Sequence, residues 1–302
     1  MMLGTTLAFL GELTSAQAHL EQGIAFSDLR KYPSMASRPG DPQVVGRSWL
    51  GYVLWWLGYP DQALDRNREA LTLVREQSHP YSLASTLSFA ARVHQFCREA
   101  SLTRERAEAA MALATEHGFA QILAMGTILR GWALAEQGQG EEGIAQMHQG
   151  LAAYQAMGAG VGQSDFLALL AEAYGKAGQT EEGLGVLAEA LAAVDKTGEH
   201  FYEPELYRLK GELTLAQSRV QSLASSAQKE AEACFQKAIE IAQRQQAKSL
   251  ELRASTSLAR LWQQQGKQKE AHELLAEIYG WFTEGFDTAD LQDAKALLEE
   301  LS

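Results

Sequence analysis

The chain of 302 residues is short of cysteine, of basic residues and of long apolar runs, and each shortage excludes a class of protein. Cys97 and Cys234 are the two cysteines, which are too few and too far apart to encode a disulfide framework. No apolar segment approaches the roughly 20 residues that a membrane-spanning helix needs, and no secretory signal pattern stands at the N-terminus. We therefore expect a cytoplasmic protein that does not bind a membrane.

Basic residues are outnumbered, because 38 acidic residues face 26 lysines and arginines, for a net charge of −12. Nucleic-acid binding depends on clustered Lys and Arg that neutralise phosphates, so we expect no nucleic-acid partner. The acidic residues are unevenly distributed along the sequence. Between Trp132 and His200 there is a long series of glutamates and aspartates, and Lys176 and Lys196 are the two lysines or arginines in that stretch. A solvated acidic face is the ordinary interpretation of such a series, and a basic partner is the alternative.

Motifs for catalysis and metal binding are also missing from the sequence. It contains no G-x-x-x-x-G-K-[ST] phosphate loop. His272 and Glu273 begin a zinc-protease motif, but the second histidine is absent, and the seven histidines do not show metal-ligand spacing. Gly158, Gly160 and Gly162 are better explained by a turn than by a phosphate site. We expect no cofactor, no metal and no enzymatic activity in this chain, and an enzyme ranks third among the functions considered.

What the sequence does contain is a repeat of 40 positions, marked by small residues. The anchors are Gly51, Ala91, Gly131, Ala171 and Gly211. A second column of small residues includes Ala63, Gly143, Gly183, Ala231 and Ala271. Two helices approach closely only where side chains are small, so each repeat predicts a pair of antiparallel helices. Gly118, Gly158 and Gly198 share the same spacing and are expected to end helices in the left-handed conformation.

The predicted fold is all-α, a right-handed α-solenoid of about seven helical pairs with a C-terminal capping helix. We expect a single domain, 1–302, with units at about 1–27, 43–77, 81–117, 119–157, 164–197, 204–246 and 248–284 and the capping helix at 288–301. Two inserts interrupt the spacing. Residues 28–45 contain three prolines and should not be helical, and residues 218–228 should lengthen a turn. The short first helix suggests that the chain begins inside a repeat.

The small residues also carry a resemblance to a known family. Gly58 with Ala63 and Ala70, and Gly266 with Ala271 and Leu275, resemble the tetratricopeptide repeat, although the unit is 40 residues where the common form has 34. Residues 231–301 more specifically resemble the C-terminal repeat region of bacterial predicted ATPases, which are often fused to adenylate or guanylate cyclase domains. That resemblance implies a sensing or partner-binding arm, with the chemistry in other domains.

In tetratricopeptide stacks the first helices line a concave groove, so the residue after each small anchor is a candidate for partner binding. The candidates in that column, with three neighbours expected on the same wall, are Tyr52, Trp55, Arg92, Gln95, Trp132, Glu172, Arg208, Glu212 and Arg260. Aromatic residues and arginines commonly anchor interfaces. The alternative is that the aromatics pack against one another or beneath the proline-rich insert.

Asn67 is the sole asparagine of the chain and is assigned to a second helix, outside the groove. Chaperone-binding and pheromone-sensing members of the resembled family use groove asparagines, so neither function is expected. We predict a protein-interaction or ligand-sensing scaffold, the regulatory arm of a bacterial signalling ATPase or nucleotide cyclase, with a protein or peptide in the groove. The alternative is a free-standing regulator that binds a small peptide or metabolite there. The sequence does not predict an oligomeric state.

Overall fold

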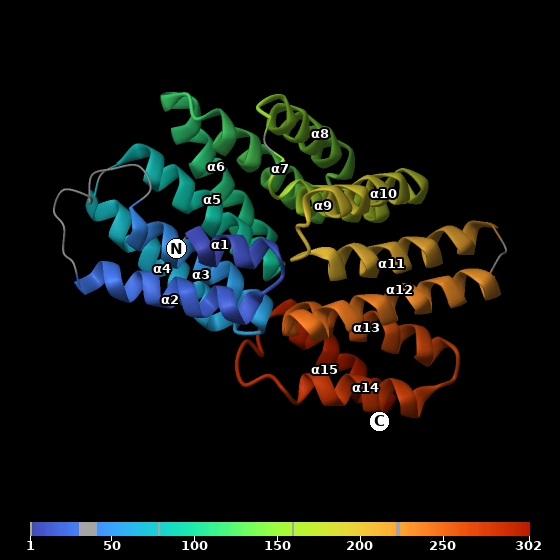
Figure 1. Ribbon diagram of the computed structural model, residues 1–302. Coiled ribbons are helices and arrows are strands. Elements are labelled where there is room, and N and C mark those ends of the chain that lie inside the picture. Colours follow the sequence, from blue (N-terminus) through green and yellow to red (C-terminus); the bar gives the residue numbers. More distant parts are fainter. Residues whose placement is uncertain (1, 30–40, 78, 159, 222–223) are drawn as a thin grey trace. The chain divides into compact units, whose positions relative to one another are not determined.

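The computed structural model describes residues 2–29, 41–77, 79–158, 160–221 and 224–302, and there every regular element is an α-helix (Figure 1). The helices are α1 (Met2–Phe9), α2 (Leu13–Leu29), α3 (Pro42–Leu57), α4 (Pro60–Gln77), α5 (Pro80–Phe96), α6 (Ala100–His117), α7 (Ala120–Glu136), α8 (Gly140–Ala156), α9 (Gln163–Lys176), α10 (Thr180–Thr197), α11 (Glu203–Gln221), α12 (Ala224–Gln245), α13 (Lys248–Gln264), α14 (Gln268–Tyr279) and α15 (Ala289–Leu301). The predicted all-α class is confirmed.

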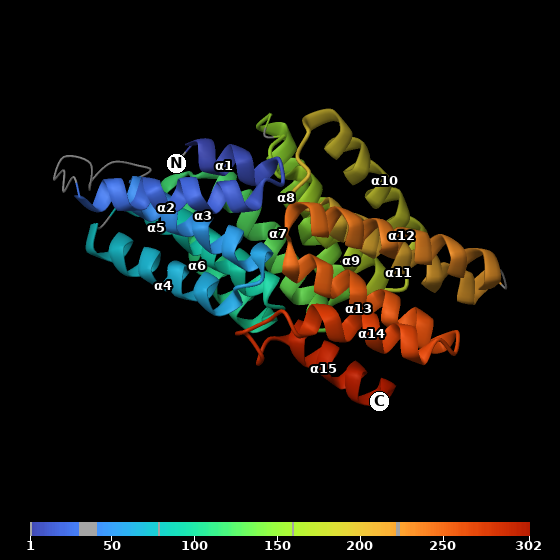
Figure 2. The same cartoon turned by 60° about the horizontal axis from the view of Figure 1, so that its bottom comes forward.

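The chain forms two compact units. Unit 1 comprises Met1–Trp55 and Pro60–Gly160, and unit 2 comprises Trp56–Tyr59 and Val161–Ser302. Within each unit, consecutive helices pack as pairs, such as α7 with α8 and α11 with α12 (Figures 1 and 2). The expectation of a single domain stays a prediction, since each unit is described by itself.

First helices of successive pairs also lie next to one another. In unit 1, α5 contacts α7, and in unit 2 the helices α9, α11, α13 and α15 contact in sequence. Each of these sets of first helices therefore forms one layer. The predicted wall of the groove therefore corresponds to the first-helix layer.

Small residues allow the close pairing, as predicted. A Cβ atom added to Gly131 on α7 would lie 2.6 Å from the carbonyl oxygen of Gly143 on α8. One added to Gly150 would lie 2.8 Å from the carbonyl oxygen of Ala124. Real Cβ atoms do not approach that closely, so α7 and α8 cross at a distance that a larger residue would prevent.

Turn glycines take the expected conformation. Gly118, Gly158 and Gly198 have φ angles of 74°, 71° and 74°, which confirms the predicted left-handed caps. The third repeat has Arg98 where other repeats have glycine, and Arg98 adopts the same left-handed conformation, with φ 62°. The turn geometry is thus conserved within the chain even where the residue type departs from the pattern.

Both inserts differ from the prediction where they are described. Residues 30–40 lie outside the described residues, but α2 continues to Leu29 and α3 begins at Pro42. Pro42 starts a helix rather than breaking one because the first helical position needs no N–H, and the backbone N–H of Gln43 donates to Asp41 Oδ1 at 2.8 Å.

The second insert is mostly helical as well. Helix α11 continues to Gln221 and α12 begins at Ala224, so the expected longer turn over 218–228 is wrong. This stretch contains neither glycine nor proline, the strongest helix-ending residues, and both helices extend into it. The extra length of the sixth repeat is therefore taken up by longer helices, and residues 222–223 lie outside the described part.

The predicted capping helix 288–301 is present as α15. It packs against α13 and α14, and buries Leu291, Ala294, Leu297 and Leu301 in a cluster with Leu275 and Phe282. No helix in the described ranges combines the length and apolar character needed to cross a bilayer.

Candidate functional site

The predicted wall residues of unit 1 are buried. Tyr52 and Trp55 lie on α3, Arg92 and Gln95 on α5, and Trp132 on α7, and none of the five is more than 8% exposed. The structure therefore places them inside the protein rather than on an open surface. Their role in binding a partner stays a prediction.

The aromatic candidates pack against other rings across α1, α3 and α5. Trp55 stacks on Phe96 with centroids 4.7 Å apart, and Tyr52 lies 4.8 Å from Phe89. The Arg92 guanidinium lies 4.7 Å from the centre of the Phe96 ring. Tyr52 and Trp55 thus pack against the aromatic rings of Phe89 and Phe96 on α5.

Sequence reasoning missed four members of this cluster, namely Phe9, Trp49, Phe89 and Phe96. Trp49 contacts Phe9 with centroids at 5.1 Å and Phe89 at 5.4 Å. A signal was available in the sequence, because Phe9, Trp49 and Phe89 stand at successive intervals of one repeat length, 40 residues.

The predicted wall residues of unit 2 are more accessible. Glu172 lies on α9, Arg208 and Glu212 on α11, and Arg260 on α13, three helices that contact in sequence. The side chains of Glu212 and Arg260 are 42% and 48% exposed. The structure therefore brings these four residues onto one layer of unit 2 and leaves part of that layer open to solvent.

Arg208 is the centre of a network of ion pairs in this layer. Its Nε and Nη2 atoms donate to the two carboxylate oxygens of Glu205 at 2.9 and 2.7 Å, and Nη1 lies 2.6 Å from Glu212 Oε1. Burial by itself would lower the pKa of the Arg208 guanidinium, but the adjacent Glu205 and Glu212 carboxylates raise it well above its usual value. Arg208 is consequently a permanent cation that fixes the position of Glu212.

Two further contacts complete the arrangement. The Ser257 hydroxyl on α13 donates to Glu212 Oε1 at 2.8 Å. Arg253 on α13 pairs with Asp290 of α15 at 2.7 Å and approaches Glu205 at 3.4 Å. Sequence reasoning missed Glu205, Arg253 and Asp290. The spacing of Glu205 and Arg208 by three residues was a usable signal, whereas the pairing of Arg253 with Asp290 depends on how α13 meets α15.

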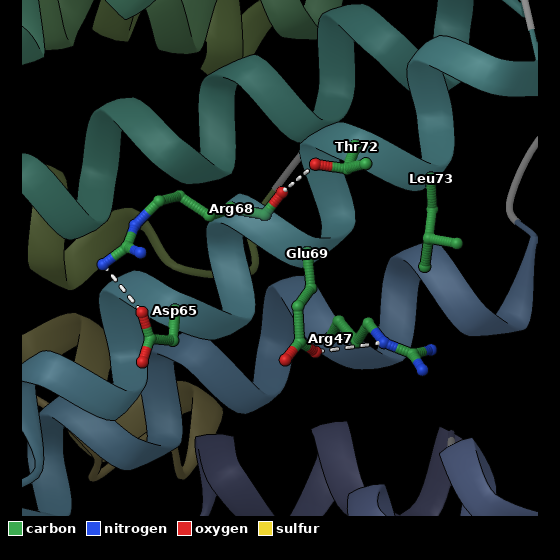
Figure 3. A pocket seen from close by; sticks show the side chains of 6 residues that line it. All are labelled: Arg47, Asp65, Arg68, Glu69, Thr72 and Leu73. Atoms are coloured by element: carbon green, nitrogen blue, oxygen red, sulfur yellow. Dashed lines mark hydrogen bonds and ion pairs between the residues drawn. The ribbon is translucent and has the colours of Figure 1, made fainter.

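An open hollow of about 470 Å³ lies on α3 and α4 of unit 1 (Figure 3). Its charged side chains pair with one another, Arg68 with Asp65 at 2.7 Å and Arg47 with Glu69 at 3.4 Å. Figure 3 shows both pairs lying along the hollow and not converging on one point. The hollow therefore offers no focused charge for a ligand.

Metal ligands and thiols do not converge in the described structure. Among the described residues, no group of three or more His, Cys, Asp or Glu side chains could hold a metal ion. Cys97 and Cys234 are both buried and form no disulfide.

Comparisons with known proteins identify the fold. No family model and no curated protein matches the chain. Among solved structures, it is similar to a Rap protein complexed with competence and sporulation factor, at a TM-score of 0.66 and 14% identity, covering 99% of this chain and 77% of that one.

Two other solved structures have comparable folds. The apo form of RapI matches at a TM-score of 0.52 and 14% identity, over 99% of this chain and 97% of that one. A tetratricopeptide repeat protein from Parabacteroides merdae matches at 0.51 and 13%, over 99% and 96%. At such low identities the likeness concerns the fold, and the chain has the fold of tetratricopeptide repeat proteins.

Proposed function

We propose that this chain is a scaffold without catalytic activity that binds a protein or peptide along the first-helix layer of unit 2. The binding wall comprises Glu172, Arg208, Glu212 and Arg260. The observation that carries the proposal is the Glu212 carboxylate, held in place by Arg208 and Ser257 while its side chain stays 42% exposed. A carboxylate fixed in this way binds with little loss of side-chain freedom.

The carboxylates of the wall support a partner segment that carries hydrogen-bond donors. The arginines of the wall are paired with acids, Arg208 with Glu205 and Glu212 and Arg260 with Asp293 at 3.8 Å, and Glu172 lies 3.8 Å from Lys176. Glu172 and Glu212 come from neighbouring helices, α9 and α11, and the whole chain carries a net charge of −12. Arg208 is occupied by Glu205 and Glu212, so it positions an acceptor more than it attracts an anion. This favours lysine, arginine or backbone N–H groups on the partner.

Binding of labelled peptides tests this proposal. We expect lysine-rich peptides to bind more tightly than matched glutamate-rich ones, and the double variant Glu172→Gln, Glu212→Gln to weaken binding about tenfold, which corresponds to about 1.4 kcal/mol. Glu189→Gln, on the exposed face of α10, is the control and should bind normally. Full affinity in the double variant would remove this wall as the site.

A finer proposal is that the scaffold is the regulatory arm of a bacterial signalling ATPase or nucleotide cyclase. It is supported by the resemblance of residues 231–301 to the repeat regions of such proteins. The coding sequence upstream of Met1 tests it directly. A nucleotide-binding or cyclase domain there would support the proposal, and an unrelated upstream gene would contradict it.

A free-standing regulator that binds a small peptide or metabolite is the second candidate. The fold likeness to a Rap protein solved with competence and sporulation factor favours it. A ligand pool that raises the melting temperature would support it, because a ligand at about 100 times its Kd adds about 2.7 kcal/mol to stability. No shift with any fraction of the pool would count against it.

A further inference from the structure

The ion pairs of unit 2 form one continuous network that connects α11, α13 and α15. On α11, the Arg208 guanidinium contacts Glu212 at 2.6 Å and Glu205 at 2.7 Å. The same Glu205 oxygen, Oε1, lies 3.4 Å from Nη1 of Arg253 on α13. Arg253 Nε in turn donates to Oδ2 of Asp290 on α15 at 2.7 Å. The Glu212 carboxylate of the wall is therefore linked by successive contacts to the cap helix α15.

This network is buried except at its Glu212 end. The side chains of Glu205 and Arg253 are 5% and 9% exposed, whereas that of Glu212 is 42% exposed. Three carboxylates and two guanidinium groups make up the network, so one negative charge is in excess among these five side chains. An unbalanced charge is costly where water is excluded. The excess charge is therefore most stable on Glu212, where a cation of a partner can reach it.

Glu205 is shared between the two arginines of the network. Its Oε1 atom accepts from Arg208 at 2.7 Å, a shorter contact than the 3.4 Å to Arg253. Burial by itself would lower the pKa of the Arg253 guanidinium, but the carboxylate of Asp290 and, to a lesser extent, that of Glu205 raise it above its usual value. Asp290 is thus the main acidic partner of Arg253, which leaves Glu205 to Arg208.

Loss of the Asp290 charge would shift this balance. A buried guanidinium that loses a carboxylate partner is strongly unfavourable, so Arg253 would draw on Glu205 instead. Arg208 would then give up part of its two-point contact with Glu205 and turn more of its charge toward Glu212. A carboxylate that is neutralised in this way attracts the cation of a partner less strongly.

We propose that Asp290 and Arg253 are positioning residues for the wall, which couple the cap helix α15 to the binding of a cationic side chain at Glu212. This inference rests on the function proposed above and adds a means of regulating it. With Asp290 in place, Glu205 holds Arg208, and Glu212 keeps its charge for the partner. Such coupling is reciprocal, so a cation bound at Glu212 strengthens the contact between Arg253 and Asp290.

Binding of a labelled lysine-rich peptide to variants of the full chain tests the coupling. We expect Asp290→Asn to weaken binding about tenfold, and Asp290→Glu, which keeps the charge, to restore it. Adding Arg253→Met to Asp290→Asn should recover most of the lost affinity, because no guanidinium then competes for Glu205. Undiminished binding by Asp290→Asn, or no recovery in the double variant, would overturn the coupling and leave the wall itself in place.

Leu297→Ala is the matched control on the same helix. It weakens the packing of α15 by opening a cavity among apolar side chains, and it leaves Asp290 and its ion pair in place. We expect this variant to bind the peptide as the unaltered chain does. A merely structural role of Asp290 would instead weaken binding in Leu297→Ala as much as in Asp290→Asn.

Hydrogen exchange in α15 tests the coupling without a partner. In Glu212→Gln the acidic partner left to Arg208 on α11 is Glu205, so Arg253 turns further toward Asp290. The amides of α15 should then exchange about fivefold more slowly, and Glu189→Gln on α10 should leave them unchanged. If the unaltered chain binds no lysine-rich peptide, the proposed function fails and the exchange rates decide the coupling. Unchanged exchange in Glu212→Gln would overturn the coupling in either case.

Discussion

Gly185 and Gly198 lie on the same helix, α10, but have opposite conformational demands. Gly185 is within the helix with open space around its Cα, whereas Gly198 caps the helix at φ 74°. We expect Gly185→Ala to raise the free energy of unfolding by about 0.5–1 kcal/mol, because alanine favours the helix. Gly198→Ala should lower it by about 1–2 kcal/mol, because a Cβ atom disfavours left-handed backbone. Chemical denaturation measures both, and effects of the same sign would contradict this account.

Glu199 makes unit 2 sensitive to pH. Burial raises the pKa of its carboxyl, and the hydrogen bond from the Gly162 N–H, at 2.8 Å, partly offsets that rise. The folded chain therefore binds this proton more tightly than the unfolded chain, whose carboxyl has a pKa of about 4.3. The contribution of Glu199 to stability is present below that pH and is lost as pH rises through the folded pKa.

Glu199→Gln tests this effect, since glutamine keeps an acceptor for Gly162 but carries no charge. We expect the free energy of unfolding of the variant to fall less steeply between acid and neutral pH. Denaturation midpoints at several pH values measure it, with the exposed Glu189→Gln as the control. Parallel pH profiles for the variant and the unaltered chain would exclude Glu199 as a cause.

At the scale of the element, the crossing of α7 and α8 depends on Gly131. A Cβ atom there would lie 2.6 Å from Gly143 O and 3.0 Å from the Met147 backbone nitrogen, so the helices must separate to admit it. We expect Gly131→Ala to lower the free energy of unfolding by about 1–3 kcal/mol, despite the better helix propensity of alanine. Thermal unfolding measures this, with Gly185→Ala as the control that lacks a facing helix. A stabilised Gly131→Ala variant would show that the crossing can relax.

At the scale of the molecule, α15 closes the apolar surface that α13 and α14 present. Leu297 is 3% exposed in a cluster with Leu275 and Phe282. Deleting residues 289–302 should expose that cluster and cause concentration-dependent association, because solenoid ends need a polar cap. Light scattering measures the association, and the exposed Lys295→Ala substitution should leave the chain unaffected. A truncated chain that stays monodisperse would contradict the capping role.

The local features of the fold were predictable because they depend on short-range sequence. The 40-residue spacing located the helical pairs and the glycine caps, and the apolar residues of 288–301 located α15. The prediction was wrong where one residue type is compatible with two local structures, a helix or a turn. Proline breaks a helix in its interior but is tolerated at its first position, which Pro42 occupies in α3, and residues 218–221 and 224–228 continue helices where a turn was expected.

The sequence by itself determined that small residues recur every 40 positions, that glycines end several helices, and that the chain folds into tetratricopeptide-like helical pairs. Tertiary structure decided which members of one repeating column are exposed. Tyr52 and Trp132 are buried, whereas Glu212 and Arg260 in the same column are partly open. Periodicity assigns a residue to a face of its helix, but neighbouring helices determine whether that face is covered. For the same reason the pairing of Arg253 with Asp290 could not be read from spacing.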